Sequence, residues 1–181
     1  MTIHSWSGLG VRDSLTDDDI DDIVSREYLV KRYAKTSVLV IDEISMLSGG
    51  FLGNLDRLLR SARVSLDPFG GIQIVLVGDF FQLPPVSRGM SEVEYAFEHP
   101  IWRETKLIPC VLTTQYRQQG GISQDPLLTI LNEIRAGKVT QKSLDILESR
   151  NIPVETEDHT ELFTRNISVD AYNKEKLDSI A

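Results

Sequence analysis

Hydrophobic residues along the chain follow two spacings, and each spacing predicts a different kind of element. Residues 37–41 and 72–79 are almost continuously apolar and rich in β-branched side chains, which predicts strands buried on both faces. Two further runs, residues 109–117 and 161–166, also predict strands. Apolar residues at helical spacing predict helices over residues 14–33 and 51–64. Pro126 and Gly137 mark the start and stop of a predicted helix over 125–138, and residues 140–150 and 168–181 are also predicted to be helical.

The order of these elements predicts the fold class. Strands that alternate with helices and are apolar throughout are typical of an α/β protein with a parallel sheet and helices on both faces. Beyond Gly120 and Gly121 the pattern changes, because helices dominate the remaining residues. We therefore expect two domains: residues 1–120 form most of a first α/β domain, and residues 121–181 form connecting helices and the start of a second.

Polar side chains follow three of the predicted strands at the point where each strand ends: Asp42-Glu43, Asp79 to Gln82, and Gln115 to Arg117. In a parallel sheet these ends meet at the edge where ligands bind. A buried strand that ends in Asp-Glu is the layout of a Walker B site. Its Asp would reach a Mg²⁺ ion at nucleotide phosphates, and its Glu would orient or deprotonate the attacking water. The alternative is an acidic pair that is simply solvated at the surface.

The other two strand ends carry side chains suited to the same chemistry. The amide of Gln82 could hydrogen-bond a γ-phosphate and respond to its loss, which would couple hydrolysis to movement. The guanidinium of Arg117 could stabilise charge on the transferred phosphoryl group, with an ordinary surface ion pair as the alternative. Phe80 and Phe81 are predicted to pack in the core or loop rather than to stack on bases.

Composition narrows the partners and the compartment. The 181 residues carry a formal net charge of −8, which argues against binding nucleic acid through bulk positive charge but leaves room for a local basic groove. Cys110 is the single cysteine, so no disulfide can form within the chain and an intracellular compartment is favoured. The three histidines show no metal-binding spacing, and no apolar run is long enough to cross a membrane.

Four segments, in this order along the chain, resemble a known family: "TIHSWSGLG", "VLVIDEISML", "PFGGIQIVLVGDFFQLPPV" and "LTTQYRQ". They resemble motifs Ia, II, III and IV of superfamily one DNA helicases. The "PFGGIQ" run leading into "GDFFQLPPV" is similar to the signature of the petite integration frequency (PIF-type) family. "LNEIRAGK" and "ELFTRNISVDAYNKEKL" resemble the stretch where this family enters its second motor domain. The resemblance therefore implies a RecA-like P-loop sheet.

The resemblance also implies a function. Members of this family are ATP-dependent motors that move 5′ to 3′ on single-stranded DNA, separate duplex or forked DNA, and serve DNA repair, recombination and telomere maintenance. By this resemblance Asp42 would bind Mg²⁺, and Glu43 would act on the hydrolytic water at the ATP site. Gln82 and Arg117 would meet the γ-phosphate of ATP.

Thr2, His4 and Trp6 stand in the motif that the resemblance assigns to the DNA strand. From the residues alone, His4, Ser5 and Trp6 offer hydrogen bonds and a flat face that could stack a base, worth ~1–3 kcal/mol per base. The alternative is a loop Trp packed over the sheet. A monomer is favoured, and the expected compartment is the nucleus or mitochondrion in a eukaryote and the cytoplasm in a bacterium.

The sequence also departs from the family pattern. It contains no GxxxxGK[S/T] and no motif V or VI, so we expect a sheet without its first, Walker A strand and with an exposed apolar edge. We expect the parent protein to be a helicase and this chain alone to be inactive or very weak. The alternatives are a non-hydrolysing remnant that binds DNA or a partner, and the helicase domain of a mobile element or relaxase.

Overall fold

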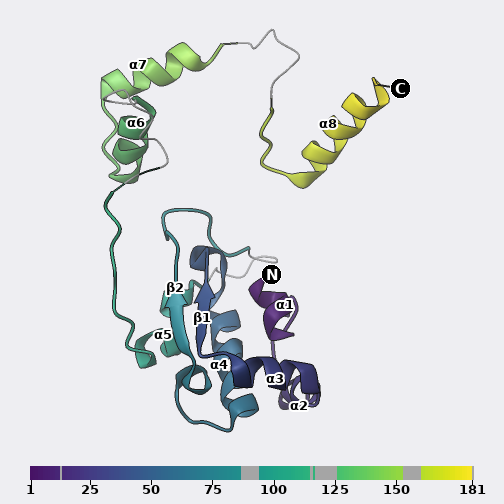
Figure 1. Ribbon diagram of the computed structural model, residues 1–181. Coiled ribbons are helices and arrows are strands. Elements are labelled where there is room, and N and C mark those ends of the chain that lie inside the picture. The colour runs from purple at the N-terminus through teal and green to yellow at the C-terminus, as the bar shows by residue number, and fades with distance from the viewer. Residues whose placement is uncertain (13, 87–93, 115, 117–125, 153–159, 181) are drawn as a thin grey trace. The chain divides into compact units, whose positions relative to one another are not determined.

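The computed structural model describes residues 1–12, 14–86, 94–114, 116, 126–152 and 160–180 (Figure 1). The chain divides into two compact units, Met1–Thr114 and Gln115–Ala181. The boundary expected near residue 120 lies outside the described residues. The predicted identities of the two domains as motor domains stay predictions.

A two-stranded parallel sheet forms the centre of the first unit. Strands β1 (Val38–Ile41) and β2 (Gln73–Leu76) pair in register, with Val38 opposite Gln73 and Ile41 opposite Leu76. Figure 1 shows the two arrows side by side and pointing the same way. This pairing agrees with the predicted α/β class, and it brings the carboxyl ends of both strands to one edge.

The prediction that these strands are buried on both faces was wrong for both strands. No residue of β2 is buried, and Val75 is 37 % exposed. In β1, Leu39 and Ile41 are buried, but the intervening Val38 and Val40 are 46 % and 59 % exposed. Successive side chains of a strand point to opposite faces, so this alternation means that one face is covered and the other is open. Among the described residues, no layer covers the face that Val38 and Val40 present.

Helix α4 (Gly49–Arg63) is the centre of the hydrophobic core. Its first turn is capped by Ser48, whose Oγ accepts a hydrogen bond from the Phe51 N–H at 3.1 Å. Its buried stripe, in which each side chain is at most 1 % exposed, consists of Leu52, Leu55, Leu58 and Leu59. The helices that pack against α4 are α2 (Asp17–Val24), α3 (Glu27–Lys35) and α5 (Pro100–Glu104).

The single helix predicted over residues 14–33 is two helices, α2 and α3, separated at Ser25 and Arg26. The reason lies in the spacing of the buried residues. On one continuous helix the four side chains of Ile20, Ile23, Leu29 and Tyr33 could not share one face, because each residue advances the helix by about 100° and Leu29 would lie opposite Ile20. All four side chains are buried, so the break is what lets both pairs face the core.

Arg63 fixes the chain just before each strand. Its Nε donates to the Gly70 carbonyl at 2.7 Å, in the turn η2 (Pro68–Gly71) that leads into β2. Its Nη1 donates to the Tyr33 carbonyl at 2.6 Å and the Thr36 carbonyl at 3.3 Å, just before β1. Gly70 has φ +62°, and a Cβ there would lie 2.5 Å from the Leu59 carbonyl oxygen, so only glycine fits this close approach.

Asp56 anchors the same turn from the middle of α4. The residue is buried, with 8 % of its surface exposed. Its carboxylate accepts a hydrogen bond from the Phe69 N–H at 2.7 Å. Arg60 Nε donates to both of its oxygens, at 2.9 and 2.8 Å. The Arg60 guanidinium also donates to Glu104 of α5 and to the Leu66 carbonyl. The Arg60 charge is therefore bonded to two carboxylates and one carbonyl.

Two predicted strands do not form. Residues 109–114, the described part of one, have no regular secondary structure, and Ile108, Val111 and Leu112 are 84–91 % exposed. Residues 161–165 also form no strand, and the next residue, Asn166, begins helix α8. A strand needs a neighbour for its backbone hydrogen bonds, and the described sheet holds only β1 and β2. Local β-propensity therefore did not suffice.

The described part of the second unit is helical: α6 (Pro126–Arg135), α7 (Gln141–Arg150) and α8 (Asn166–Asp178). These helices agree with the sequence predictions to within a few residues. Thr140 begins α7 as its N-cap, and its N–H donates to Glu133 of α6 at 2.8 Å. No described helix combines the length and apolar character needed to cross a membrane.

Candidate functional site

The loops that leave β1 and β2 are bonded to each other. The Ile44 N–H donates to the Val77 carbonyl at 3.0 Å, and the Val77 N–H donates to the Ile41 carbonyl at 2.9 Å. Gly78 permits this approach, because a Cβ there would lie only 2.9 Å from the Ile44 nitrogen. The Asp42-Glu43 pair and the Asp79 loop therefore leave the sheet next to one another, as the parallel order predicts.

The acidic pair is exposed at this edge. Asp42 directly follows β1, and its Oδ1 accepts a hydrogen bond from the Glu43 N–H at 2.9 Å. Glu43 has φ +54° and ψ +46°, the left-handed conformation, which costs a non-glycine residue of order 1 kcal/mol. An ordinary solvated acid needs no such backbone, and strained positions of this kind cluster at functional sites.

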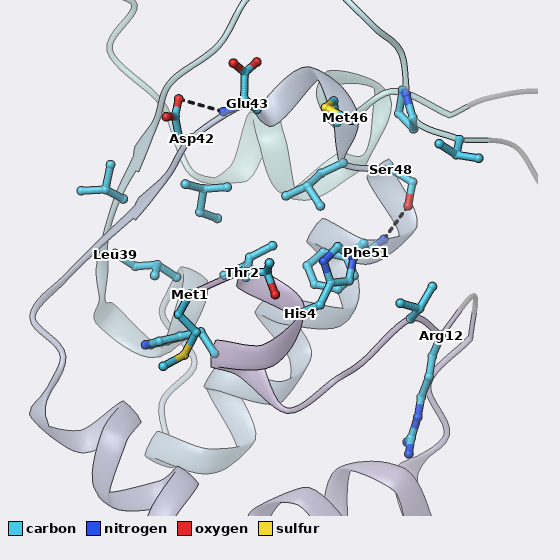
Figure 2. A pocket seen from close by; sticks show the side chains of 18 residues that line it. Met1, Thr2, His4, Arg12, Leu39, Asp42, Glu43, Met46, Ser48 and Phe51 are labelled. Atoms are coloured by element: carbon cyan, nitrogen blue, oxygen red, sulfur yellow. Dashed lines mark hydrogen bonds between the residues drawn. The ribbon is translucent and has the colours of Figure 1, made fainter. Parts of the chain in front are cut away.

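A cavity of about 780 Å³ opens between β1 and the N-terminal helix α1 (Ile3–Ser7). Five of the predicted site residues line it: Thr2, His4, Trp6, Asp42 and Glu43. Figure 2 shows Asp42 and Glu43 on one side of the cavity and Thr2 and His4 on the other. Apolar side chains from β1 and α4, including Leu39 and Phe51, form the walls between them.

The predicted DNA-facing residues lie on a helix, not in a loop. Thr2 is the N-cap of α1, and its side chain accepts a hydrogen bond from the Ser5 N–H at 3.3 Å. The His4 ring lies 4.5 Å from the Phe51 ring. Trp6 is half-buried, with its ring centroid 5.5 Å from that of Tyr33. The short helix thus presents its cap and His4 toward the cavity, and Trp6 lines the same cavity while its ring packs on Tyr33.

Gln82 belongs to a tight turn after β2. Its N–H donates to the Asp79 carbonyl at 2.9 Å, and its Nε2 donates to Asp79 Oδ2 at 3.2 Å. The turn holds the amide at the same edge as the acidic pair, although Gln82 itself does not line the cavity. Pro85 and Val86, a few residues further along the same loop, do line it.

The two phenylalanines before Gln82 differ. Phe80 packs as predicted, with its ring 4.9 Å from Phe97 and 5.8 Å from Trp102. Phe81 is 79 % exposed, so it is not part of the core. Arg117, the predicted arginine finger, lies outside the described residues.

Mg²⁺ commonly binds proteins through one or two carboxylates and takes its remaining ligands from water and substrate phosphates. An exposed Asp42 at a strand end fits that pattern. The described residues contain no group of three or more His, Cys, Asp or Glu side chains that could hold a metal by themselves. A metal at this edge would therefore depend on the phosphates of a nucleotide.

Sequence reasoning missed part of this site. Arg12 also lines the cavity and pairs with Asp19 at 2.7 Å, and Met46 and Ser48 contribute to its wall. Arg12 could have been noticed as the first cation after the "GLG" turn. No sequence pattern marks Met46 or Ser48 as a site residue, because only the packing of α4 against β1 brings them to the cavity.

The described fold is a small α/β fold, with a two-stranded parallel sheet, flanking helices and acidic residues at the strand ends, and the solved structures that it matches place it in the RecA-like class. The chain belongs to the PIF1-like helicase family, whose sequence model matches residues 1–144. It is 40 % identical to the ATP-dependent DNA helicase Pif1 of Psychrobacter sp. over 183 aligned residues, which cover 98 % of this chain and 28 % of that protein. The chain thus spans about a quarter of the length of the curated relatives it matches.

Solved structures give the same result. The crystal structure of Pif1 helicase from Candida albicans matches with a TM-score of 0.86 and 34 % identity, covering 100 % of this chain and 41 % of that one. A Pif1 helicase from Bacteroides in complex with ADP-AlF3 and single-stranded DNA matches with a TM-score of 0.79 and 30 % identity, covering 98 % of this chain and 43 % of that one.

Proposed function

We propose that this chain is the part of an ATP-dependent DNA helicase that carries the magnesium–nucleotide carboxylates and a contact surface for single-stranded DNA. The observation that supports it best is the Ile44–Val77 hydrogen bond, which joins the two strand-end loops beside Asp42 and Glu43. Membership of the PIF1-like helicase family agrees with this proposal, as does the complex of the Bacteroides relative with ADP-AlF3 and single-stranded DNA.

Each site residue has a proposed role in hydrolysis. Asp42 would hold Mg²⁺, which when bound neutralises charge on the phosphates. Glu43 would accept a proton from the attacking water, and its left-handed backbone would hold its carboxylate clear of β1. Gln82 would sense the γ-phosphate from the turn that Asp79 closes, and Arg117 would stabilise charge on the transferred group.

The DNA strand would contact α1 across the cavity from the carboxylates, through Thr2, His4 and Trp6. The proposed motor moves 5′ to 3′ and opens duplex or forked DNA, as the family resemblance implies, and it works as a monomer inside the cell. Repair, recombination and telomere maintenance are its proposed settings. Because the carboxylates and α1 line the same cavity, a change at the nucleotide would alter the affinity for DNA.

A substitution at Glu43 tests the hydrolytic role in the full-length protein. Glu43→Gln should retain ATP binding and lower the hydrolysis rate by about 10²–10⁴-fold, because an amide cannot accept the proton of the attacking water. Glu27→Gln, a matched change at a 79 % exposed side chain that pairs with Lys31 on the same helix, should leave the rate unchanged. Steady-state ATPase and nucleotide-binding assays measure both, and near wild-type hydrolysis by Glu43→Gln would refute the role.

Gln82→Ala tests the coupling. Without the amide, single-stranded DNA should stimulate ATP hydrolysis less, and the difference in DNA affinity between ATP-bound and ADP-bound protein should shrink. Fluorescence anisotropy with labelled single-stranded DNA in each nucleotide state gives the second quantity. Unchanged stimulation together with an unchanged affinity difference would exclude Gln82 as the sensor.

A non-hydrolysing module that binds DNA or a partner is the second candidate, since hydrolysis needs a phosphate-binding lysine of the GxxxxGK[S/T] type in addition to the carboxylates described. The chain by itself should then show little or no ATP hydrolysis. Comparing ATP turnover of the 181-residue chain with that of the full-length protein separates the candidates. Hydrolysis by the full-length protein supports the helicase, and its failure to hydrolyse ATP supports the binding module.

A further inference from the structure

We propose that Arg32 and Tyr33 of α3 are positioning residues: they hold α1 in place and thereby set the affinity for single-stranded DNA. The proposal rests on the proposed function for its DNA readout. It assigns a role to two residues that lie outside all four helicase-like motifs and outside the lining of the cavity.

Helix α1 cannot hold its own position. It has five residues, which is far shorter than a helix that is stable by itself in water. It ends at Gly8, whose φ of +71° reverses the chain. Its carbonyls in the last turn have no continuing helix to bond them. Its placement against the cavity must therefore come from contacts made by other elements.

Tyr33 supplies two of these contacts. It is fully buried, and its hydroxyl donates to the Ser7 carbonyl at 2.5 Å, at the end of α1. Its ring lies 5.5 Å from the Trp6 ring at an interplanar angle of 56°. Burial raises the pKa of the Tyr33 phenol to about 12, so the hydroxyl remains a donor throughout the physiological range.

Arg32 supplies the third contact, from the neighbouring position on α3. Its Nη1 donates to the Trp6 carbonyl at 2.6 Å and lies 3.5 Å from the Ser5 carbonyl. A cation at the last carbonyls of a helix satisfies groups that would otherwise lack partners. Together, Arg32 and Tyr33 bond three consecutive carbonyls, from Ser5 to Ser7.

A steric contact completes the attachment. A Cβ on Gly8 would lie 2.7 Å from Leu29 Cδ1, so the chain at the end of α1 rests directly on α3. The helix α3 is in turn tied to the sheet, because Arg63 bonds the Tyr33 and Thr36 carbonyls just before β1. These contacts therefore fix the position of His4 relative to β1, which is followed by Asp42 on the opposite side of the same cavity.

The main test uses Tyr33→Phe in the full-length protein, with Tyr28→Phe as the matched control. Tyr33→Phe removes the hydroxyl bonded to Ser7 and keeps the ring that packs on Trp6. Tyr28 is on the same helix but 60 % exposed, and its ring lies 5.8 Å from the Arg32 guanidinium. Phenylalanine keeps that ring and removes only a hydroxyl that makes no bond to α1, so Tyr28→Phe should leave α1 in place. A thermal midpoint for each variant verifies that the fold is retained.

Two readouts are taken from each variant. Amide hydrogen exchange at Trp6, Leu9 and Gly10, whose N–H groups bond within this segment, should be about 5–10-fold faster in Tyr33→Phe. The single-stranded DNA concentration that half-maximally stimulates ATP hydrolysis should rise by about the same factor, with the maximal rate retained. A purely structural loss would instead lower the maximal rate through a smaller folded fraction.

Arg32 provides an independent variant on the partly exposed side. Arg32→Gln should have the same effects, and Arg32→Lys should recover part of the affinity, because an ammonium can still donate to the Trp6 carbonyl. Unchanged exchange at α1 in both Tyr33→Phe and Arg32→Gln overturns the proposal. So does faster exchange with unchanged half-saturation by DNA. If the wild-type protein itself fails to bind single-stranded DNA, the proposed function fails, and hydrogen exchange alone then decides whether α3 anchors α1.

Discussion

The two units of this chain are built by different means. In Met1–Thr114 the buried hydrophobic side chains form one continuous cluster around α4. In the described part of Gln115–Ala181 the buried residues are Ile130 and Ser143, and α8 buries none of its side chains. The first unit therefore has a tertiary core, whereas the helices of the second are held mainly by local interactions.

The difference follows from the pattern of apolar residues. Leucines of α4 recur on one side of the helix and meet α2, α3 and α5 there. In α8, Ile167 and Leu177 are 75 % and 67 % exposed, and the apolar residues do not gather on one face. Helices of this length that do not pack are only marginally stable in water. Regular secondary structure by itself is thus no sign of an independent fold.

Truncation of a buried leucine should give the largest contrast between the units. Leu55→Ala, at a fully buried position, should lower the free energy of unfolding by about 2–5 kcal/mol, through lost burial and the cavity left behind. Leu144→Ala on α7, 41 % exposed, should cost less than about 1 kcal/mol. Urea unfolding followed by tryptophan fluorescence reports the first unit, because both tryptophans lie there, and far-ultraviolet circular dichroism follows the whole chain. Equal losses would mean that the second unit has a core of its own.

The buried ion pair should show the next largest effect. Asp56→Asn removes the carboxylate that accepts hydrogen bonds from both Arg60 and the Phe69 N–H. The new amide NH₂ is itself a donor and would face the donor groups of Arg60. We expect a loss of about 1.5–3 kcal/mol in the free energy of unfolding, the range for hydrogen bonds to charged groups. The same urea titration measures it. A loss below the error of that titration would show that the "PFGG" turn needs no anchor on α4.

Glu43 should behave in the opposite sense from these core positions. Glu43→Gly removes a side chain from a left-handed backbone position and should raise the stability of the first unit by about 0.5–1 kcal/mol. ATP hydrolysis in the full-length protein should be lost at the same time. Thermal unfolding paired with an ATPase assay tests this trade. A destabilised Glu43→Gly variant would contradict the view that this residue is strained for function.

The smallest effect is expected in the second unit, from the pH dependence of the turn between α6 and α7. The backbone N–H of Thr140, assisted by hydroxyl donors, lowers the pKa of the Glu133 carboxyl below its ordinary value of 4.5. Because the folded pKa is the lower one, this contribution is complete above pH 4.5 and disappears as the pH falls through the folded value. Helicity followed between about pH 6 and 3 should decline less in Glu133→Gln than in the wild type, and identical curves would contradict the role.

Much of the local structure could be predicted from the sequence. The strands at 38–41 and 73–76, α4, α6 and α7 follow from hydrophobic spacing and from residues that start and stop helices, whereas α8 has neither a single apolar face nor a side-chain cap. The predictions failed where a partner was needed. Residues 109–114 have strand-forming side chains but no described neighbour to pair with, and the helix over 14–33 broke because its apolar residues face two directions.

Some features of the candidate site could likewise be predicted from the sequence, and others could not. Asp42, Glu43 and Gln82 were recognisable because parallel strands bring the residues after their carboxyl ends to one edge of the sheet. The attachment of α1 to α3 was not, because the backbone carbonyls that Arg32 and Tyr33 bind have no identity in a sequence.

By itself, the sequence determined the family, the parallel order of the strands and the identity of the acids at their ends, because these depend on residue type and local spacing. Only the tertiary structure decided which face of the sheet is covered, that Thr2 and His4 lie across a cavity from Asp42, and what holds them there. Those features depend on contacts between segments distant in the sequence, such as Tyr33 and Ser7, which are 26 residues apart, and such contacts form only when the core around α4 has packed.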